Sequence, residues 1–245
     1  MEFKILHLYY DILNLYGEYG NVSALERYLS DQGGTVVTDR LTVGDTPVFS
    51  EYDMVYLGSG TERGELAVLE DMKRHREGIS EALERKVPIL ATGNSFELFG
   101  RNITEANGTS HEGLCLFHFV TALNDKERTL CDQICSSVIS ELPFVGFINK
   151  ASQITGVEQP MFTVIHGAGN SDGDAGEGIR EGSFYGTHLT GPCLVKNPHL
   201  AEHFVKLIAE NKGISYMPPV CEYEKKAYQI TLDALRERFE KKKNK

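Results

Sequence analysis

The strongest constraint on the fold is an alternation of short apolar runs with helical stripes through the first half of the chain. The apolar runs predict strands at 3–8, 35–38, 53–57 and within 86–91. Apolar residues at helical spacing predict helices over 22–29 and over 66–85. Strands that alternate with helices of this length form βαβ units around a mainly parallel sheet. We therefore predict an α/β fold, whose ligands bind at the carboxyl ends of the strands.

The second half of the chain is richer in predicted strands. These cover residues 134–139, 144–148, 161–166 and 184–189. Between the last two, residues 167–178 are rich in glycine and aspartate, which predicts a loop. Its aspartate spacing resembles a calcium-binding loop, but the bidentate glutamate and flanking helices of such a loop are missing. We expect no metal ion there.

Two helices are predicted near the end of the chain. Asn197 and Pro198 provide a cap and a first helical residue, and Gly213 stands where the helix should stop. A last helix is expected to begin near residue 222. Its apolar residues share one side: Tyr228, Leu232, Leu235 and Phe239. We expect a main domain over 1–215 and a C-terminal helical extension over 216–245. The extension packs on its own domain or, as the alternative, on a partner chain.

Composition excludes several classes of protein. The net charge of −10 argues against nonspecific nucleic-acid binding, which needs basic side chains to displace counterions. No secretion signal and no apolar run of about 18 residues is found, so we expect a cytoplasmic protein without a membrane span. The odd number of scattered cysteines fits reduced thiols. Cys131 and Cys135 could form half of a metal site, but no second pair follows at a suitable spacing.

One stretch, KVPILATGNSFELFG from Lys86 to Gly100, predicts a strand that turns sharply into a helix. Many α/β hydrolytic enzymes carry their nucleophile on such an elbow. Here the residue at the tip is Gly93. An elbow residue is often held at positive φ, which costs a side chain about 1–3 kcal/mol but costs glycine nothing. The sequence therefore keeps the turn and omits the reactive group.

Five stretches together resemble one family over nearly the whole chain. They are LNLYGEYGNVSAL (13–25), DMVYLGSGTER (53–63), ILATGNSFELFG (89–100), VGFIN (145–149) and FYGTHLTGPCLVKNP (184–198). In this order they resemble the cobyric acid synthase-type class-I glutamine amidotransferases. Within that family the likeness is greatest to the glutaminase subunits of bacterial lipid II isoglutaminyl synthases.

The resemblance implies a three-layer, flavodoxin-like fold with a mainly parallel central sheet, and it implies no cofactor. In the family, an elbow cysteine attacks the side-chain amide of glutamine, and a nearby histidine activates the thiol and protonates the leaving ammonia. Backbone N–H groups form the oxyanion hole. A Mur ligase-like synthetase subunit then uses the ammonia to amidate the peptidoglycan stem peptide.

When the family motifs are compared with this sequence position by position, neither reactive residue is present. Where the family elbow reads Cys-Gly-Gly-Tyr-Gln-x-Leu-Gly, Gly93 stands at the cysteine position. Where the family's late strand reads Gly-Thr-Tyr-Leu-His-Gly-Pro, Thr190 stands at the histidine position. Gly58 and Gly60 match the oxyanion turn, and Arg128 matches an arginine near the glutamine substrate. The resemblance thus implies a retained substrate cradle on a degenerate, non-hydrolysing subunit.

Other groups keep two further hypotheses open. Ser95 and His188 could replace the lost pair, since a serine needs a base within hydrogen-bonding reach. That would make the chain an active amidohydrolase. Asn94 could hold a polar ligand or cap a helix, so the old pocket could also serve a small-molecule sensor. Glu97 adds an ionisable group where the family has glutamine, and we interpret Cys193 as a small buried hydrophobe.

Overall fold

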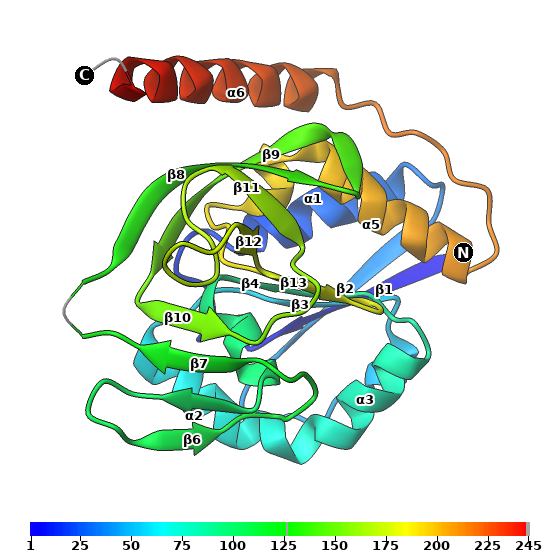
Figure 1. Ribbon diagram of the computed structural model, residues 1–245. Helices are drawn as coiled ribbons and strands as arrows, with labels where there is room; N and C mark the ends of the chain where they lie inside the picture. Colours follow the sequence, from blue (N-terminus) through cyan, green and yellow to red (C-terminus); the bar gives the residue numbers. More distant parts are fainter. Residues whose placement is uncertain (126, 244–245) are drawn as a thin grey trace.

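A six-stranded sheet forms the centre of the computed structural model, which describes residues 1–125 and 127–243 (Figure 1). Its strand order is β13 (Ile179–Glu181), β14 (Phe184–Thr187), β4 (Ile89–Thr92), β3 (Met54–Leu57), β1 (Glu2–Leu8) and β2 (Thr35–Leu41). Neighbouring strands are parallel except β13, which runs antiparallel to β14. The predicted α/β class with a mainly parallel sheet is confirmed.

Helices cover both faces of this sheet (Figure 1). One face carries α1 (Tyr19–Ser30), α4 (Cys193–Lys196) and α5 (Pro198–Asn211), and the other carries α2 (Glu62–Met72) and α3 (Arg76–Glu84). Alternate residues of β1 supply the two cores, because successive side chains of a strand point to opposite faces. Phe3 and Ile5 pack with the first set, and Leu6 and Leu8 pack with the second.

The helical region expected over 66–85 is two helices rather than one. A single 3-10 turn, η2 (Lys73–His75), separates α2 from α3. A second short 3-10 helix, η1 (Phe49–Glu51), precedes β3 and packs against α3 through Phe49, which lies in the same core as Ile79. The break lets α3 turn to cover η1.

Two smaller sheets complete the layers. One has the order β10 (Ser152–Thr155), β7 (Val120–Leu123), β5 (Asn102–Thr104) and β6 (Ser110–Glu112). The other has the order β12 (Gly176–Glu177), β11 (Phe162–His166), β8 (Thr129–Ser137) and β9 (Ser140–Lys150). The strands predicted in the second half of the chain are present, with β8 and β9 longer than expected.

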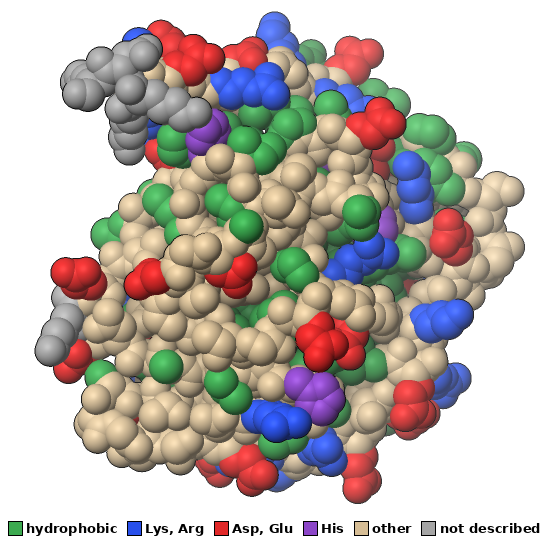
Figure 2. All heavy atoms as spheres, in the orientation of Figure 1, with side chains coloured by type: hydrophobic (Ala, Val, Ile, Leu, Met, Phe, Trp, Pro, Cys, Tyr) green, Lys and Arg blue, Asp and Glu red, His purple; other side chains and the backbone are tan. Residues whose placement is uncertain are grey.

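The last helix, α6 (Glu222–Lys243), lies across the sheet that contains β8 and β9 (Figure 1). Tyr228, Leu232 and Leu235 pack against Ile134 and Val145. No helix in the described part of the chain combines the length and the apolar character that a membrane span requires. Figure 2 shows acidic and basic side chains mixed over the face it presents.

The start of α5 is tied to the edge strand β9 by one side chain. Asn197 is fully buried; its Oδ1 accepts from the Val145 N–H at 2.8 Å, and its Nδ2 donates to the Val145 carbonyl at 2.8 Å. The same Nδ2 also donates to the Cys193 carbonyl at 2.8 Å. One carboxamide therefore satisfies backbone groups of both β9 and α4.

Replacing Asn197 should destabilise the fold strongly. We expect Asn197→Ala to lower the free energy of unfolding by about 2–4 kcal/mol, because buried backbone groups lose their partners. Asn211→Ala is the matched control, since that exposed side chain makes a single hydrogen bond to the Lys86 carbonyl. Urea unfolding of both variants measures the difference. Equal effects at the two positions would contradict this account of Asn197.

Candidate functional site

The elbow after β4 has the backbone conformation that the sequence suggested. β4 ends at Thr92, and Gly93 follows with φ +65°. The segment beyond it, η3 (Gly93–Phe99), is a 3-10 helix and not the expected α-helix. Its last carbonyls, those of Leu98 and Phe99, accept hydrogen bonds from backbone N–H groups of residues 114, 116 and 117. The chain therefore ends its helical path there.

Ser59 fills the space beside the elbow. A Cβ atom added to Gly93 would lie 2.2 Å from Ser59 Oγ and 2.3 Å from Ser59 Cβ, which real atoms do not tolerate. Ser59 sits in the turn after β3, between Gly58 and Gly60. A Cβ at Gly58 would meet the Leu13 carbonyl oxygen at 2.2 Å. The turn is thus pressed against the elbow on one side and against the loop after β1 on the other.

The Asn94 side chain closes the remaining space between these turns. Its Oδ1 accepts from the Gly60 N–H at 2.9 Å and from Ser59 Oγ at 3.3 Å, and its Nδ2 donates to Glu65 Oε2 at 2.9 Å. The open space that the surrounding side chains leave is about 10 Å³, room for one water molecule. Asn94 is therefore bonded within the protein and does not act as a helix cap.

A buried polar network binds Thr92, the residue that precedes the elbow. Glu18 accepts hydrogen bonds from Tyr56 Oη, from Asn21 Nδ2 at 3.0 Å and from Thr92 Oγ1 at 2.9 Å. Burial raises the pKa of the Glu18 carboxyl, and these hydrogen bonds oppose the rise. Asn21 Oδ1 also accepts from the Leu194 N–H at 2.8 Å. The first, second, third and fifth sequence motifs meet in this network.

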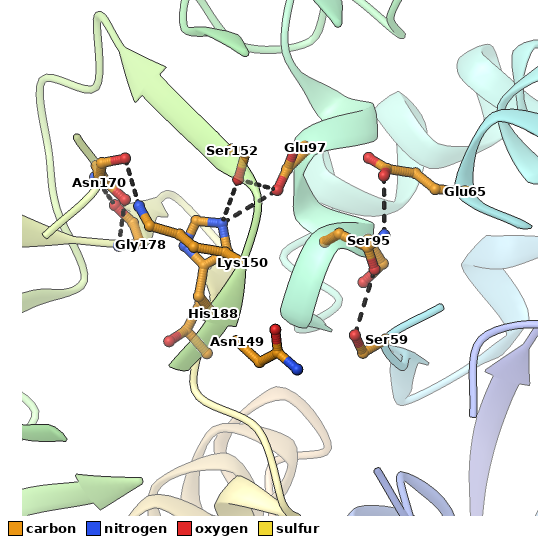
Figure 3. Close-up of polar contacts among 12 residues, drawn as sticks. Ser59, Glu65, Ser95, Glu97, Asn149, Lys150, Ser152, Asn170, Gly178 and His188 are labelled. Atoms are coloured by element: carbon orange, nitrogen blue, oxygen red, sulfur yellow. Dashed lines mark hydrogen bonds and ion pairs between the residues drawn. The ribbon is translucent and has the colours of Figure 1, made fainter. Parts of the chain in front are cut away.

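The structure does not join Ser95 to His188. Ser95 is buried, and its hydroxyl donates to the Thr92 carbonyl at 3.0 Å. His188, just past the end of β14, turns its Nε2 toward Glu97 Oε1 at 3.2 Å (Figure 3). Its Nδ1 lies 3.3 Å from Glu177 Oε1. The imidazole has a carboxylate at each nitrogen and lies away from the elbow serine. The arrangement lacks the serine–base contact that nucleophilic catalysis needs.

Sequence reasoning missed three members of this buried cluster. Ser152 Oγ donates to Glu97 Oε1 at 2.7 Å, and Glu177 accepts from the His188 N–H at 2.7 Å. Lys150 Nζ donates to the carbonyls of Gly169 and Asn170, each at 2.6 Å. Burial lowers the Lys150 pKa, and the nearby carboxylates oppose this. The only signals in the sequence were that Lys150 directly follows VGFIN and that Glu177 lies inside the glycine-rich loop. Charged residues at such positions are usually expected to be solvated.

Two other predicted site residues, Thr190 and Arg128, serve as ties between elements. Thr190 donates its hydroxyl and its N–H to the Phe147 carbonyl, both at 3.0 Å. Arg128 Nε donates to Asn149 Oδ1 at 2.8 Å, and its guanidinium pairs with Glu62. Cys193 is fully buried in the core, as expected, and burial raises the pKa of its thiol. Arg128 alone of these lines the small space beside Asn94.

The described residues contain no group of three or more His, Cys, Asp or Glu side chains placed to hold a metal ion. Cys131 and Cys135 lie on β8, and Cys135 belongs to the hydrophobic core. In the glycine-rich loop, Asp174 Oδ1 accepts from the Gly176 N–H at 2.8 Å, and Asp172 Oδ1 accepts from Gln153 at 3.2 Å. These two aspartates therefore bond to the loop and its neighbour.

Glu65 should make the fold less stable as pH rises. Burial and the nearby Glu97 charge raise its pKa well above 4.5 in the folded state, so folding favours the protonated form. This contribution is fully present below pH 4.5 and is lost as pH rises toward the folded pKa. We expect Glu65→Gln to be more stable than the unmodified chain at neutral pH, with a difference that shrinks on acidification, in urea unfolding across pH.

Glu62→Gln is the matched control for this pH series. Partial burial of Glu62 raises its pKa, but the hydrogen bond and charge of Arg128 outweigh burial and lower it. Its stability contribution is present above the unfolded pKa and is lost on acidification, which is the opposite sign. The account of Glu65 fails if both variants show the same dependence on pH.

The contact between Ser59 and Gly93 should appear as a coupling energy. We expect Gly93→Ala to destabilise the fold by about 2–4 kcal/mol, from positive φ and from the clash together. Gly33→Ala isolates the first effect at about 1 kcal/mol, because Gly33 has φ +78° and open space around it.

Adding Ser59→Gly to Gly93→Ala should recover part of the loss. We expect a coupling of roughly 1–2 kcal/mol in the double-mutant cycle, measured by urea unfolding. Strict additivity of the two substitutions would mean that Ser59 does not press on the elbow.

Comparison with known proteins places the chain in a family. The model of the CobB/CobQ-like glutamine amidotransferase domain matches residues 4–198. The lipid II isoglutaminyl synthase (glutamine-hydrolyzing) subunit GatD of Staphylococcus aureus is 28% identical, over 95% of this chain and 96% of its own. The same subunit of Streptococcus pneumoniae is 26% identical, over 86% of this chain and 82% of its own. Probable cobyric acid synthases of Methanoculleus marisnigri and Methanosarcina acetivorans are 27% and 30% identical, but only 41% and 31% of their own chains are covered.

Solved structures show the same fold. A glutamine amidotransferase of Thermotoga maritima is 13% identical with a TM-score of 0.51, and covers 96% of this chain and 95% of its own. The glutaminase domain of the CTPS of Trypanosoma brucei is 10% identical with a TM-score of 0.54, and covers 89% of this chain and 96% of its own. The three-layer class-I amidotransferase fold implied by the five motifs is confirmed, and the chain belongs to the CobB/CobQ-like glutamine amidotransferase family.

Proposed function

We propose that this chain is a non-hydrolysing glutamine amidotransferase-like subunit of a lipid II isoglutaminyl synthase-type assembly in the cytoplasm. In this role it pairs with a Mur ligase-like synthetase subunit and contributes to amidation of the peptidoglycan stem peptide without releasing ammonia from glutamine itself. The family and the near full-length likeness to two GatD subunits support the assembly.

The observation that carries the loss of hydrolysis is the filled elbow. The cysteine position is Gly93, and Ser59 occupies the place of any side chain there. The Gly60 N–H, at the oxyanion position, already donates to Asn94. An oxyanion hole works because its donors point at a vacant position where charge develops. Here that donor is occupied, and about 10 Å³ of space cannot admit a glutamine side chain.

The alternative of relocated catalytic groups has less support. Ser95 and His188 bond to different partners, and the hydroxyl that replaces the family histidine, that of Thr190, donates to a backbone carbonyl. Cys193 is buried with a raised thiol pKa, the opposite of what a reactive thiolate requires. The sensor hypothesis gains no support from the space beside Asn94, which is only about 10 Å³.

This proposal is tested by which nitrogen donor, ammonium or glutamine, the assembly can use. We expect the purified complex of this chain with its ligase-type subunit to amidate its substrate with ammonium chloride and not with L-glutamine. The reason is that no glutamine hydrolysis supplies the ammonia. Product formation is measured by mass spectrometry with ¹⁵N-ammonium or ¹⁵N-amide glutamine as the donor, and a hydrolytically active GatD complex is the positive control.

The chain alone gives the complementary measurement. Ammonia release from L-glutamine should stay at the blank level for the unmodified chain, for Ser95→Ala and for His188→Gln alike. Glutamine-dependent release by the unmodified chain that either substitution abolishes would overturn the proposal in favour of relocated groups. Failure of the chain to bind a ligase-type subunit would overturn the proposed assembly.

A further inference from the structure

The outer side of α6 carries an apolar stripe that faces away from the domain. Tyr223 is 86% exposed and Ile230 is 62% exposed, and Ala227 and Ala234 are exposed between and beyond them. At about 100° per residue these four residues share one side of the helix, roughly opposite the domain-facing Tyr228. In Figure 1 the rest of the described chain lies beneath α6. The helix therefore has two apolar sides, one packed on the domain and one exposed.

The spacing of this stripe is that of a coiled-coil seam. The steps from residue 223 to 227, 230 and 234 are four, three and four, which match alternating d and a positions of a heptad. The seam is about 16 Å long at 1.5 Å rise per residue. Large and small residues alternate along it in the order Tyr, Ala, Ile, Ala.

We propose that this seam pairs with the α6 seam of a second copy of the chain, antiparallel, to form a homodimer. In that register Tyr223 faces Ala234 of the other copy and Ala227 faces Ile230, so every layer sets a large residue against a small one. A parallel pair would set Tyr against Tyr and Ala against Ala, which leaves gaps. Because the seam is opposite the packed side of α6, the two domains lie on opposite sides of the helix pair.

The flanking charges favour the same register. Lys226 and Asp233 are exposed at the two g positions beside the seam. In an antiparallel pair the g positions of the two copies face one another, so Lys226 lies opposite Asp233 of the other copy, twice by symmetry. In a parallel pair Lys226 would lie near Thr231 instead. The charge pattern is thus self-complementary for antiparallel pairing.

The helix is held in place to present this seam. On its flanks Glu224 pairs with Arg27, Lys225 Nζ lies 3.1 Å from Glu202, and Arg238 pairs with Asp132. Little ordering is lost on pairing when the surface is already fixed. A seam this short buries less than the roughly 1,200 Å² of a standard interface, so the dimer should be weak and depend on concentration. This inference is independent of the proposed catalytic role.

Sedimentation velocity of the full chain over a wide concentration range tests the dimer. We expect a reversible monomer–dimer equilibrium that Ile230→Glu abolishes. Lys226→Asp and Asp233→Lys should each weaken it roughly tenfold, because two attractions become two repulsions. Arg236→Asp is the matched control: it makes the same charge change away from the seam and should leave the dimer intact. Circular dichroism establishes that each variant is folded.

The decisive arm mixes the two single variants. In the mixed dimer one site pairs Asp at 226 with Lys at 233 of the other chain, and the second site keeps the original Lys226–Asp233 pair. The mixture should therefore form a heterodimer as tight as the unmodified homodimer. The Lys226→Asp/Asp233→Lys double variant, in which both sites are reversed, should do the same. A chain that stays monomeric at every concentration would overturn the proposal. So would a dimer that ignores the charge substitutions, or single variants that fail to recover on mixing.

Discussion

The close contact between the turn at Gly93 and the turn at Ser59 is the constraint on which the site depends. Parallel strands β3 and β4 end side by side, so the turns that follow them must share one small volume. With a residue at positive φ in one turn, only glycine leaves room for a serine side chain in the other. Ser59 and Gly93 therefore have to be understood as a pair.

The sequence motifs are far apart in the chain but meet around this pair. Glu18 from the first motif binds Thr92, which precedes the elbow, and Tyr16 accepts a hydrogen bond from Asn149 of the fourth. Asn197 from the fifth holds β9. The motifs thus describe the mutual packing of loops at the carboxyl ends of the strands. That role requires no reactive group at the elbow, so packing alone can account for the motifs.

The order of strands and helices could be predicted from the sequence because burial imposes periodicity. β1 and α5 both follow their apolar spacing, and the positive φ of Gly93 follows from the elbow pattern. The cluster of Glu97, His188 and Glu177 could not be predicted. Glu97 lies in η3, Glu177 in β12 and His188 just past β14, and their burial depends on long-range packing that local pattern does not encode. The end of η3 likewise depends on distant backbone donors, the N–H groups of residues 114, 116 and 117.

The turn at Gly93 and the buried carboxylates near it differ in whether their polar groups are satisfied. A working catalytic site keeps strained residues and unoccupied donors ready for substrate, at a cost in stability. Here glycine removes the strain at the elbow, and Asn94 occupies the Gly60 donor. Near the elbow, buried carboxylate oxygens without a hydrogen-bond partner remain on Glu18, Glu65 and Glu97. Burial and the nearby Glu97 charge raise the pKa of Glu65, so the carboxyl that accepts from Asn94 favours its protonated form more than a solvated glutamate does.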